Sequence, residues 1–365
     1  MTQEKALSLL KSGRNIFLTG SAGTGKTYVL NQFIQHLSDA KIEVAVTAST
    51  GIAATHIKGS TIHSWSGIGV KQTLSTKDLE YIKKKKYLRD QFNKTKVLII
   101  DEISMLHQDQ LNTIHSVLEY CIGDSRAFGG IQVVLCGDFF QLPPIGQNNE
   151  RSRDKFAFMS SAWQFADFNI CYLTEQYRQT NNQLTSILDE IRTASISEKS
   201  ISLLNKASST TFESGIEPTK LYTHNIDVDK INNTHLAELP GKSRFFKAKT
   251  TGEKALIVTL KKQVLTLSEM QLKIGAKVMF VKNHPEKIYI NGTLGEVIKY
   301  SKLGFPIVKT LDNNEVTAGT MEWSIANETG QILASYKQIP LRLAWAITVH
   351  KSQGMTLDAA ELDLG

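Results

Sequence analysis

Cysteine is scarce in this chain, and long apolar runs are missing. The three cysteines among 365 residues, Cys121, Cys136 and Cys171, lie far apart without metal-ligand spacing, so we expect core thiols in a reducing compartment. No apolar run approaches the ~20 residues that span a bilayer. The first residues, MTQEKALSLLKSG, contain no apolar signal-peptide region. These absences argue against a secreted or membrane-spanning protein and predict one of the cytoplasm or nucleus.

The length and pattern of the chain predict an α/β protein with more than one domain. A chain of 365 residues exceeds one ordinary core, so two or three domains are expected. Strand and helix signals alternate from Ile16 to Cys136, which predicts a parallel sheet with helices on both faces. No internal repeat or low-complexity tract interrupts this pattern.

A second α/β series follows, and we expect its first strand at Ile170–Leu173. From Phe245 to Ala334, short apolar runs such as Leu256–Leu260 are separated by glycines and asparagines. This stretch predicts a small antiparallel β-barrel inserted in the second layer. The α/β pattern resumes at Leu341–Leu364.

A glycine-rich segment, GSAGTGKT at Gly20–Thr27, matches G-x-x-x-x-G-K-[ST] and lies between a predicted strand and a predicted helix. Its glycines let the backbone turn tightly and direct N–H groups at phosphates, and the helix adds its positive end. Lys26 suits the β and γ phosphates, and the Thr27 hydroxyl suits a magnesium position. The segment therefore predicts a cradle for a magnesium nucleotide.

An acidic strand end supplies what this cradle needs for hydrolysis. Val97–Ile100 read as a fully buried strand, and Asp101 and Glu102 follow it directly. Asp101 is expected to hold magnesium through water, and Glu102 to polarise the attacking water. The two segments together predict a nucleotide-hydrolysing protein.

Positive charge is concentrated in one part of the chain. The formal charge is +7, and ten Lys and Arg oppose three acids between residues 58 and 96, an excess equal to that of the whole chain. The α/β rhythm also breaks between Ser66 and Thr95, which suggests an insertion carrying this basic patch. The patch indicates a polyanion such as nucleic acid. The run Lys83–Lys86 taken alone is equally typical of a solvated helix face.

The segment Val46–Trp65 combines small residues with hydroxyls after a predicted strand. Residues such as Thr50 and Gly51 let backbone N–H groups approach a phosphodiester closely. His63 and Trp65 are suited to stacking on bases or hydrogen bonding with them, although either can instead pack inside the fold. We predict a nucleic-acid contact here.

The segment GDFFQLPPI at Gly137–Ile145 also follows a predicted strand. Gln141 is placed to sense the γ-phosphate. Phe139 and Phe140, with the two prolines, offer flat apolar faces beside a nucleic-acid channel. We expect one of the two phenylalanines to belong to the core, and we select Phe139 as the DNA contact.

Arg178, in YLTEQYRQ, follows the strand expected to open the second layer. An arginine there can reach the γ-phosphate across an interdomain cleft and stabilise charge on the transferring group. Arg178 is therefore predicted to be an arginine finger.

The segment AWAITVHKSQGMTLD, Ala344–Asp358, joins two kinds of contact on an expected loop. Thr348, His350 and Lys351 suit the phosphates of a nucleic acid. Gln353 and Gly354 are expected to face the nucleotide.

Together these motifs resemble one family. The chain is similar to the petite-integration-frequency DNA helicases. The segments that carry this resemblance are, in chain order, GSAGTGKT, TGIAATHIKGSTIHSW, DEISM, FGGIQVVLCGDFFQLPP, LTEQYRQ, GAKVMFVKN with NGTLGEV, and AWAITVHKSQGMTLD. These helicases belong to superfamily one, class B, with RecD and phage Dda as relatives. The resemblance runs from about Gln3 to Asp358, and FGGIQ and WAITVHKSQG are close to family-specific.

The resemblance implies two RecA-like P-loop NTPase domains that bind ATP and Mg²⁺ and translocate 5′ to 3′ on single-stranded DNA. It implies a monomer that also engages forked duplex DNA, acting in DNA repair, recombination and telomere maintenance. The implied first domain is 1–165 with a wedge insertion at 66–95, the second is 166–244 with 335–365, and the barrel is 245–334. The residues that the resemblance implies for the ATPase are Gln3 (which reads adenine), Lys26, Thr27, Asp101, Glu102, Gln141 and Arg178. The motifs themselves add predicted nucleotide contacts at Gly20, Gly23, Thr24, Gly25, Gln353 and Gly354, and predicted DNA contacts at Thr50, Gly51, His63, Phe139, Thr348, His350 and Lys351.

Two functions stay open at this point. The first is an ATP-dependent DNA helicase. The second is a nucleotide-gated single-stranded DNA-binding protein with little turnover, because the family's later arginine motif, resembling YVALSR, is not found before Gly365. A P-loop nucleotide kinase is disfavoured, because it has no task for Arg178, for Val46–Trp65 or for Leu341–Asp358.

Overall fold

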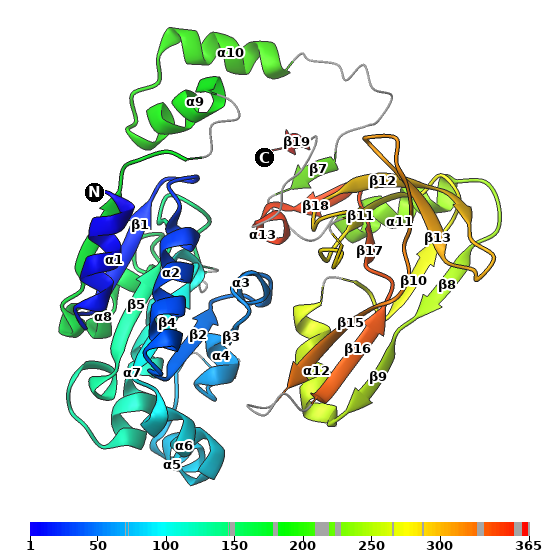
Figure 1. Cartoon of the computed structure of the whole chain (residues 1–365). Helices are drawn as coiled ribbons and strands as arrows, with labels where there is room; N and C mark the ends of the chain where they lie inside the picture. The colour runs from blue at the N-terminus through cyan, green and yellow to red at the C-terminus, as the bar shows by residue number, and fades with distance from the viewer. Residues whose placement is uncertain are drawn as a thin grey trace. The chain divides into compact units, whose positions relative to one another are not determined.

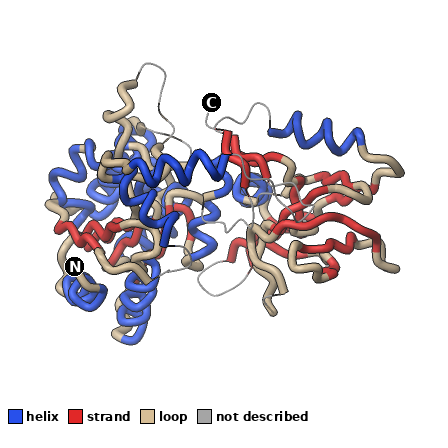
Figure 2. Tube along the Cα trace, turned by 90° about the horizontal axis from the view of Figure 1, so that it is seen from above, coloured by secondary structure: helices blue, strands red, loops and turns tan. Residues whose placement is uncertain are grey.

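The computed structural model describes residues 1–69, 71, 73–144, 146, 150–177, 182–208, 219–222, 228–264, 266–286, 288–326, 332–353 and 360–363. The chain forms two compact units, Met1–Ser208 and Ser209–Gly365, and each is described by itself. Helices and strands alternate in the first unit, whereas strands predominate in the second (Figure 2).

The first unit is built on a parallel sheet of six strands in the order β3-β2-β4-β5-β1-β6 (Figure 1). Every pairing in this sheet is parallel, as the alternating strand and helix signals predicted. The strands are β1 (Ile16–Gly20), β2 (Val44–Ala48), β3 (Ser60–Thr61), β4 (Val97–Asp101), β5 (Gln132–Cys136) and β6 (Asn169–Leu173).

Helices cover both faces of this sheet. Alternate side chains of the central strands β1, β4 and β5 enter two separate cores, because successive side chains of a strand point to opposite faces. One core is closed by α1 (Gln3–Lys11) and α2 (Lys26–Asp39). The other is closed by α7 (Gln108–Ile122) and α8 (Ser161–Ala166). Burial on both faces explains why the strand sequences are continuously apolar.

The break in rhythm after Ser66 is a helical insertion of α5 (Thr76–Lys84) and α6 (Lys86–Lys94). Ser75 and Asp78 form a capping box at the start of α5. Buried residues of both helices join the α7 side of the core. Short helices α3 (Gly51–His56) and α4 (Ile62–Trp65) precede the insertion, and α9 (Asn182–Arg192) and α10 (Glu198–Ser208) follow β6 along the chain.

The second unit combines a small parallel sheet with three antiparallel sheets. The parallel sheet has the order β18-β7-β19, and the antiparallel sheets have the orders β14-β13-β12-β11-β17, β15-β16-β9 and β10-β8. Its elements are β7 (Thr219–Tyr222), α11 (Val228–Glu238), β8 (Arg244–Lys247), β9 (Lys249–Gly252), α12 (Lys254–Gln263), β10 (Glu269–Leu272), β11 (Lys277–Phe280), β12 (Leu294–Tyr300), β13 (Pro306–Thr310), β14 (Glu315–Thr317), β15 (Met321–Ala326), β16 (Ile332–Gln338), β17 (Leu341–Leu343), β18 (Ala346–Thr348), α13 (Val349–Ser352) and β19 (Ala360–Asp363).

Three expectations about individual elements were wrong. The strand at Ile170–Leu173 does not open a second sheet, because β6 pairs with β1 of the first. The run Leu256–Leu260 is helical, since Leu256, Ile257, Leu260 and Val264 share one face that packs on Ala334 and Tyr336. Residues 341–343 pair with β11, so the parallel pattern resumes only at β18.

The three cysteines are buried and free, as predicted for core thiols. Burial raises the pKa of each thiol above its ordinary value. Among the helices in the described part of the chain, none is long and apolar enough to cross a membrane.

Candidate nucleotide-binding site

The strand order of the first sheet brings the nucleotide motifs together. Strands β1, β5 and β4 are neighbours and run parallel, so their carboxyl ends share one edge of the sheet. The glycine-rich loop follows β1, Gly137–Leu142 follows β5, and the acidic pair stands at the end of β4. In open α/β sheets this edge is where ligands bind.

The glycine-rich loop turns through residues in the left-handed region. Gly23 and Gly25 have φ of 87° and 81°, and Gly20 has φ of 150°. Residues other than glycine rarely adopt these backbone conformations. Gly25 is the N-cap of α2. The Lys26 ammonium donates to the carbonyls of Gly20 at 2.7 Å and Ser21 at 3.1 Å, so the lysine lies over its own loop. This places one positive charge and a helix N-terminus at the predicted phosphate position.

Segments distant in sequence brace the loop. The Gln3 side chain donates to the carbonyl of Thr24 at 3.1 Å. A Cβ at Gly25 would lie 2.1 Å from Gln3 Nε2, so a side chain at this position would displace Gln3 from the loop. The Gln176 side chain donates to Ser21 Oγ at 2.7 Å, and the backbone N–H of Tyr177 donates to the carbonyl of Gly23 at 3.0 Å. Gln3 thus lies against the loop, and its reading of adenine stays a prediction.

The acidic pair lies on a tight turn with strained backbone. Glu102 has φ of 51°, which is uncommon for a residue other than glycine and typical of functional turns. Its N–H donates to Asp101 Oδ1 at 2.9 Å. Ser49 holds the turn from β2, because its N–H donates to the carbonyl of Asp101 at 3.0 Å and its hydroxyl to that of Glu102 at 2.7 Å. Ser49 is therefore a structural support that the sequence did not single out.

A buried thiol adjoins the first carboxylate. Cys136 at the end of β5 is hydrogen-bonded to Asp101, and burial first, then the charge of Asp101, raises the pKa of the thiol well above its usual value. The thiol is therefore neutral at physiological pH.

The loop after β5 is organised around one carboxylate. Asp138 is 1% exposed, and its Oδ1 accepts from the Phe140 N–H at 3.2 Å and from Arg192 Nη1 at 3.0 Å. Its Oδ2 accepts from Arg192 Nη2 at 2.5 Å and from Gln141 Nε2 at 3.4 Å. The pKa of Arg192 is raised, chiefly by these hydrogen bonds. Sequence reasoning missed both Asp138 and Arg192.

The two phenylalanines of this loop have opposite surroundings. The Phe139 ring contacts those of Phe17, Phe156, Phe158 and Trp163, with centroids 4.8–5.9 Å apart. Phe140 is 69% exposed. This packing argues against the prediction that Phe139 contacts DNA, because its ring is surrounded by other rings. Phe140 is the exposed ring of the pair, with the Arg192 guanidinium over one of its faces.

The predicted DNA residues of the first unit have contacts within the protein. The Thr50 hydroxyl accepts from the Ala53 N–H at 3.2 Å in the first turn of α3, the helix that begins at Gly51. His63 Nε2 lies 2.9 Å from Gln110 Nε2, and burial lowers the pKa of this imidazole, which favours its neutral form. Trp65 packs against Phe92. The packing alternative therefore holds for Trp65, while contacts of Thr50, Gly51 and His63 with DNA stay predictions.

The predicted residues of the second unit lie at the end of β18 and in α13, a short helix where a loop was expected. Thr348 is 1% exposed, and its hydroxyl has no hydrogen-bond partner among the residues that the structure describes. The backbones of His350 and Lys351 are helical, and Gln353 is the C-cap of α13. Arg178 and Gly354 lie outside the described residues.

The side chains of Thr27 and Asp101 are the oxygen donors predicted for magnesium. Mg²⁺ keeps several waters and takes only one or two protein oxygens beside phosphates, so a hydroxyl and a carboxylate fit it. A dedicated cage of three or more His, Cys, Asp or Glu is not found within the described part of the chain, and this kind of site needs none.

Most of the residues that the sequence did not indicate are residues that hold the motifs in place. Ser49, Gln176 and Asp138 lie inside segments that were selected for other residues, so proximity to a motif was their only signal. Asp138 also precedes Gln141 by three residues, a spacing at which an aspartate side chain can bond to its own turn. Arg192 carried no signal, because it ends an ordinary amphipathic helix.

The sheet, the glycine-rich loop and the acidic strand end define a P-loop nucleotide-binding protein with RecA-like architecture. A family model for PIF1-like helicases matches residues 2–203, and the chain belongs to this family. The chain is 46% identical to the ATP-dependent DNA helicase Pif1 of Psychrobacter sp. (strain PRwf-1), covering 100% of this chain and 64% of that protein. It is 36% identical to the ATP-dependent DNA helicase PIF1 of Homo sapiens, covering 100% and 56%. It thus spans 56–64% of the length of these relatives.

Solved structures give the same result for the fold. The Pif1 helicase from Candida albicans has a TM-score of 0.75 and 34% identity, covering 99% of this chain and 88% of that one. Pif1 from Bacteroides sp in complex with ADP-AlF4 has a TM-score of 0.81 and 31% identity, covering 99% and 85%. Bacteroides Pif1 bound to ssDNA has a TM-score of 0.64 and 31% identity, covering 99% and 84%. The predicted family and α/β fold class are thereby confirmed.

Proposed function

We propose that this protein is an ATP-dependent DNA helicase that translocates 5′ to 3′ on single-stranded DNA and unwinds forked duplexes as a monomer, inside the cell. The observation that carries the proposal is the convergence at one sheet edge of Lys26, the Asp101–Glu102 turn and the Gln141 loop. This convergence joins a phosphate cradle, an acidic metal position and a γ-phosphate sensor. Relatives in complex with ADP-AlF4 and bound to ssDNA support nucleotide and DNA binding. Unwinding at forked dsDNA is described for a relative that acts there as two coordinating helicases, so it supports the forked substrate and not the monomer.

The roles of the nucleotide residues follow from their chemistry. Thr27 and Asp101 would hold Mg²⁺, which neutralises charge on the phosphates when bound. Lys26 would exchange its loop carbonyls for the β and γ phosphates, since a charged acceptor makes a stronger hydrogen bond. Glu102 would orient the attacking water, Gln141 would respond to the γ-phosphate, and Arg178 would stabilise the transferring group.

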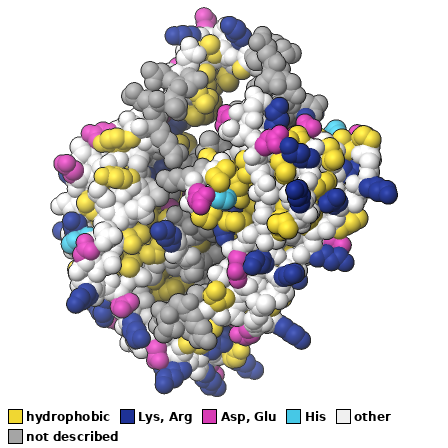
Figure 3. Space-filling view, turned by 45° about the vertical axis from the view of Figure 1, so that its right-hand side comes forward, with side chains coloured by type: hydrophobic (Ala, Val, Ile, Leu, Met, Phe, Trp, Pro, Cys, Tyr) yellow, Lys and Arg dark blue, Asp and Glu magenta, His cyan; other side chains and the backbone are white. Residues whose placement is uncertain are grey.

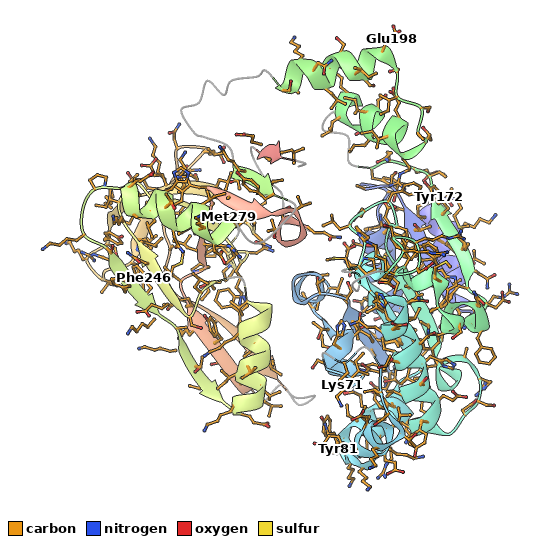
Figure 4. All side chains as sticks on the ribbon, turned by 180° about the vertical axis from the view of Figure 1, so that it is seen from behind. Lys71, Tyr81, Tyr172, Glu198, Phe246 and Met279 are labelled. Atoms are coloured by element: carbon orange, nitrogen blue, oxygen red, sulfur yellow. The ribbon has the colours of Figure 1, made fainter. Side chains whose placement is uncertain are left out.

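We propose that two surfaces contact DNA. In the first unit, α5 and α6 carry Tyr81 and Tyr87, 64% and 65% exposed, beside Lys84, Lys85 and Lys86. Figure 3 shows cationic side chains gathered at this end of the first unit, and Figure 4 shows Tyr81 at its margin. Exposed rings among lysines suit stacking on bases next to phosphates, as a wedge at a fork requires.

The second DNA surface is proposed at the end of β18. Thr348, His350 and Lys351 would contact phosphates there, and the buried Thr348 hydroxyl would gain an acceptor. The parallel sheet β18-β7-β19 would be the core of the second RecA-like domain.

The test is steady-state ATP hydrolysis by this chain with and without a single-stranded oligonucleotide, followed by unwinding of duplexes with a 5′ or a 3′ tail. Strong stimulation by DNA and unwinding from the 5′ tail alone are expected. Unwinding from the 3′ tail would contradict the proposed polarity. Tight DNA binding with negligible turnover would instead favour the nucleotide-gated binding protein.

A further inference from the structure

The carboxylate of Asp138 joins two parts of the first unit that are far apart in sequence. It accepts four hydrogen bonds, two from its own loop and two from the guanidinium of Arg192 at the end of α9. Four is about the full acceptor capacity of a carboxylate. The Asp138 side chain is 2% exposed and that of Arg192 is 16% exposed, so water competes little for these bonds.

Arg192 also contacts the loop in a second way. Its Cζ lies 4.6 Å from the centroid of the Phe140 ring, so the guanidinium is stacked on the ring while both its Nη atoms bond to Asp138. Only arginine combines a planar face with a two-pronged donor, and lysine reproduces neither. Arg192 therefore constrains the residues on either side of Phe139, which itself is fixed by its aromatic neighbours.

Gln141 is the member of this arrangement with a proposed task at the nucleotide. Its side chain has several rotatable bonds, and its amide Nε2 donates to Asp138 Oδ2 at 3.4 Å. That same oxygen receives Arg192 Nη2 at 2.5 Å. The position of the glutamine amide thus depends on where Arg192 holds the carboxylate.

We propose that Arg192 is a positioning residue for ATP hydrolysis: through Asp138 it fixes the side chain of Gln141 and so sets the rate of turnover. The inference rests on the proposed function of Gln141 as the γ-phosphate sensor. Loss of the Arg192–Asp138 ion pair would leave the glycine-rich loop and its affinity for ATP intact. Lys26 bonds to the carbonyls of its own loop, and Arg192 bonds to Asp138. Misplacing a group that orients reacting atoms by about 1 Å can reduce turnover by about 10²-fold.

The test is a double-mutant cycle of Arg192→Gln and Gln141→Ala, with kcat and KM for ATP measured at saturating single-stranded DNA. Gln141→Ala and Arg192→Gln are each expected to lower kcat by about 10- to 100-fold with KM changed less than about threefold. The double variant is expected to be no slower than Gln141→Ala alone, because both changes remove one interaction.

Three results separate the possible failures. Normal kcat in Gln141→Ala would overturn the proposed role of Gln141. A slow Gln141→Ala with a normal Arg192→Gln would overturn the positioning role alone. If Arg192→Gln slows the Gln141→Ala variant by the same factor as the wild type, Arg192 acts independently of Gln141 and the inference is also wrong.

Removing Arg192 leaves a buried carboxylate without its partner, so the variant can lose stability. Arg192→Lys keeps the positive charge and serves as a second variant. It is expected to fold and still to lower kcat several-fold. A wild-type kcat would contradict the need for the two-pronged guanidinium. Arg126→Gln is the matched control. Arg126 makes a similar two-pronged contact with Asp124, but its side chain is 75% exposed, and kcat is expected to stay unchanged.

Discussion

The two units place their chemistry in different ways. In the first, Lys26, Asp101 and Gln141 follow three adjacent parallel strands, so one sheet brings them together and hydrogen bonds within that unit fix them. In the second, the predicted DNA residues at the end of β18 belong to a three-stranded sheet, while most of the unit consists of antiparallel strands for which no ligand contact is predicted. The predicted phosphate-binding residues of the first unit can therefore be followed within one sheet, whereas the second unit has no comparable convergence among its described residues.

The core of each unit also shows this difference. The first unit has continuous apolar strands between two helical layers. The second has several smaller cores, among them one formed by the largest antiparallel sheet and another by α12 against β16. Changes in the cores of the first unit should therefore lower its overall stability, whereas changes in one of the smaller cores of the second unit should lower stability locally.

The largest expected effect is on the phosphate cradle. Lys26→Ala removes the only side-chain charge that the loop itself carries, and kcat for ATP should fall by about 10³-fold or more. Binding of single-stranded DNA without nucleotide should change less than about threefold. Both are measured by steady-state hydrolysis and fluorescence anisotropy, with the exposed Lys11→Ala as control. Unchanged turnover would refute the assignment of the cradle.

The next effect separates the two phenylalanines of the Gln141 loop. Phe139→Ala should reduce the free energy of unfolding by about 3 kcal/mol, because it removes a ring packed among four others. Phe140→Ala should cost less than about 1 kcal/mol, but it should weaken binding of single-stranded DNA if its exposed ring stacks on a base, worth about 1–3 kcal/mol. Chemical denaturation and anisotropy measure the two quantities. Equal destabilisation by both substitutions would contradict the packing argument.

The second unit should respond to high pH. Tyr289 is 4% exposed and stacked on Phe280, and burial raises the pKa of its hydroxyl to about 12. Because the unfolded chain ionises near pH 10, the stability from the neutral tyrosine is fully present below pH 10 and lost as pH rises toward 12, by at most about 2–3 kcal/mol. Denaturation between pH 9 and 12 should show a smaller loss in Tyr289→Phe. An identical loss in both proteins would exclude this tyrosine as the cause.

The smallest effect is expected at α13. Replacing His350 and Lys351 by alanine should weaken binding of single-stranded DNA about tenfold and reduce the slope of log K against log salt by about 0.7, the value for one phosphate contact. ATP hydrolysis without DNA should stay unchanged. Titrations at several salt concentrations measure this, with the control Lys302→Ala in the turn after β12. An unchanged affinity and slope would make α13 purely structural.

Much of the fold followed from local pattern. The parallel sheet, an insertion after Ser66 and the strand-rich stretch after residue 245 were predicted, because alternating apolar runs and glycine-rich breaks are local signals. That the insertion is helical was not predicted. Strand β6 was assigned to the wrong sheet, since pairing with β1 is a contact over about 150 residues that no local pattern encodes. Helix α12 was mistaken for a strand because its β-branched residues outweighed the helical spacing of its apolar face.

The sequence by itself determined the family and the chemistry of this protein, because the glycine-rich loop and the acidic strand end have fixed spacing and obligatory residue types. Only the tertiary structure decided which side chains support that chemistry. It exposed Phe140 rather than Phe139, set Ser49 under the acidic turn, and joined Asp138 to Arg192. These contacts depend on burial and on approach between distant segments, and such properties arise only when the chain is folded.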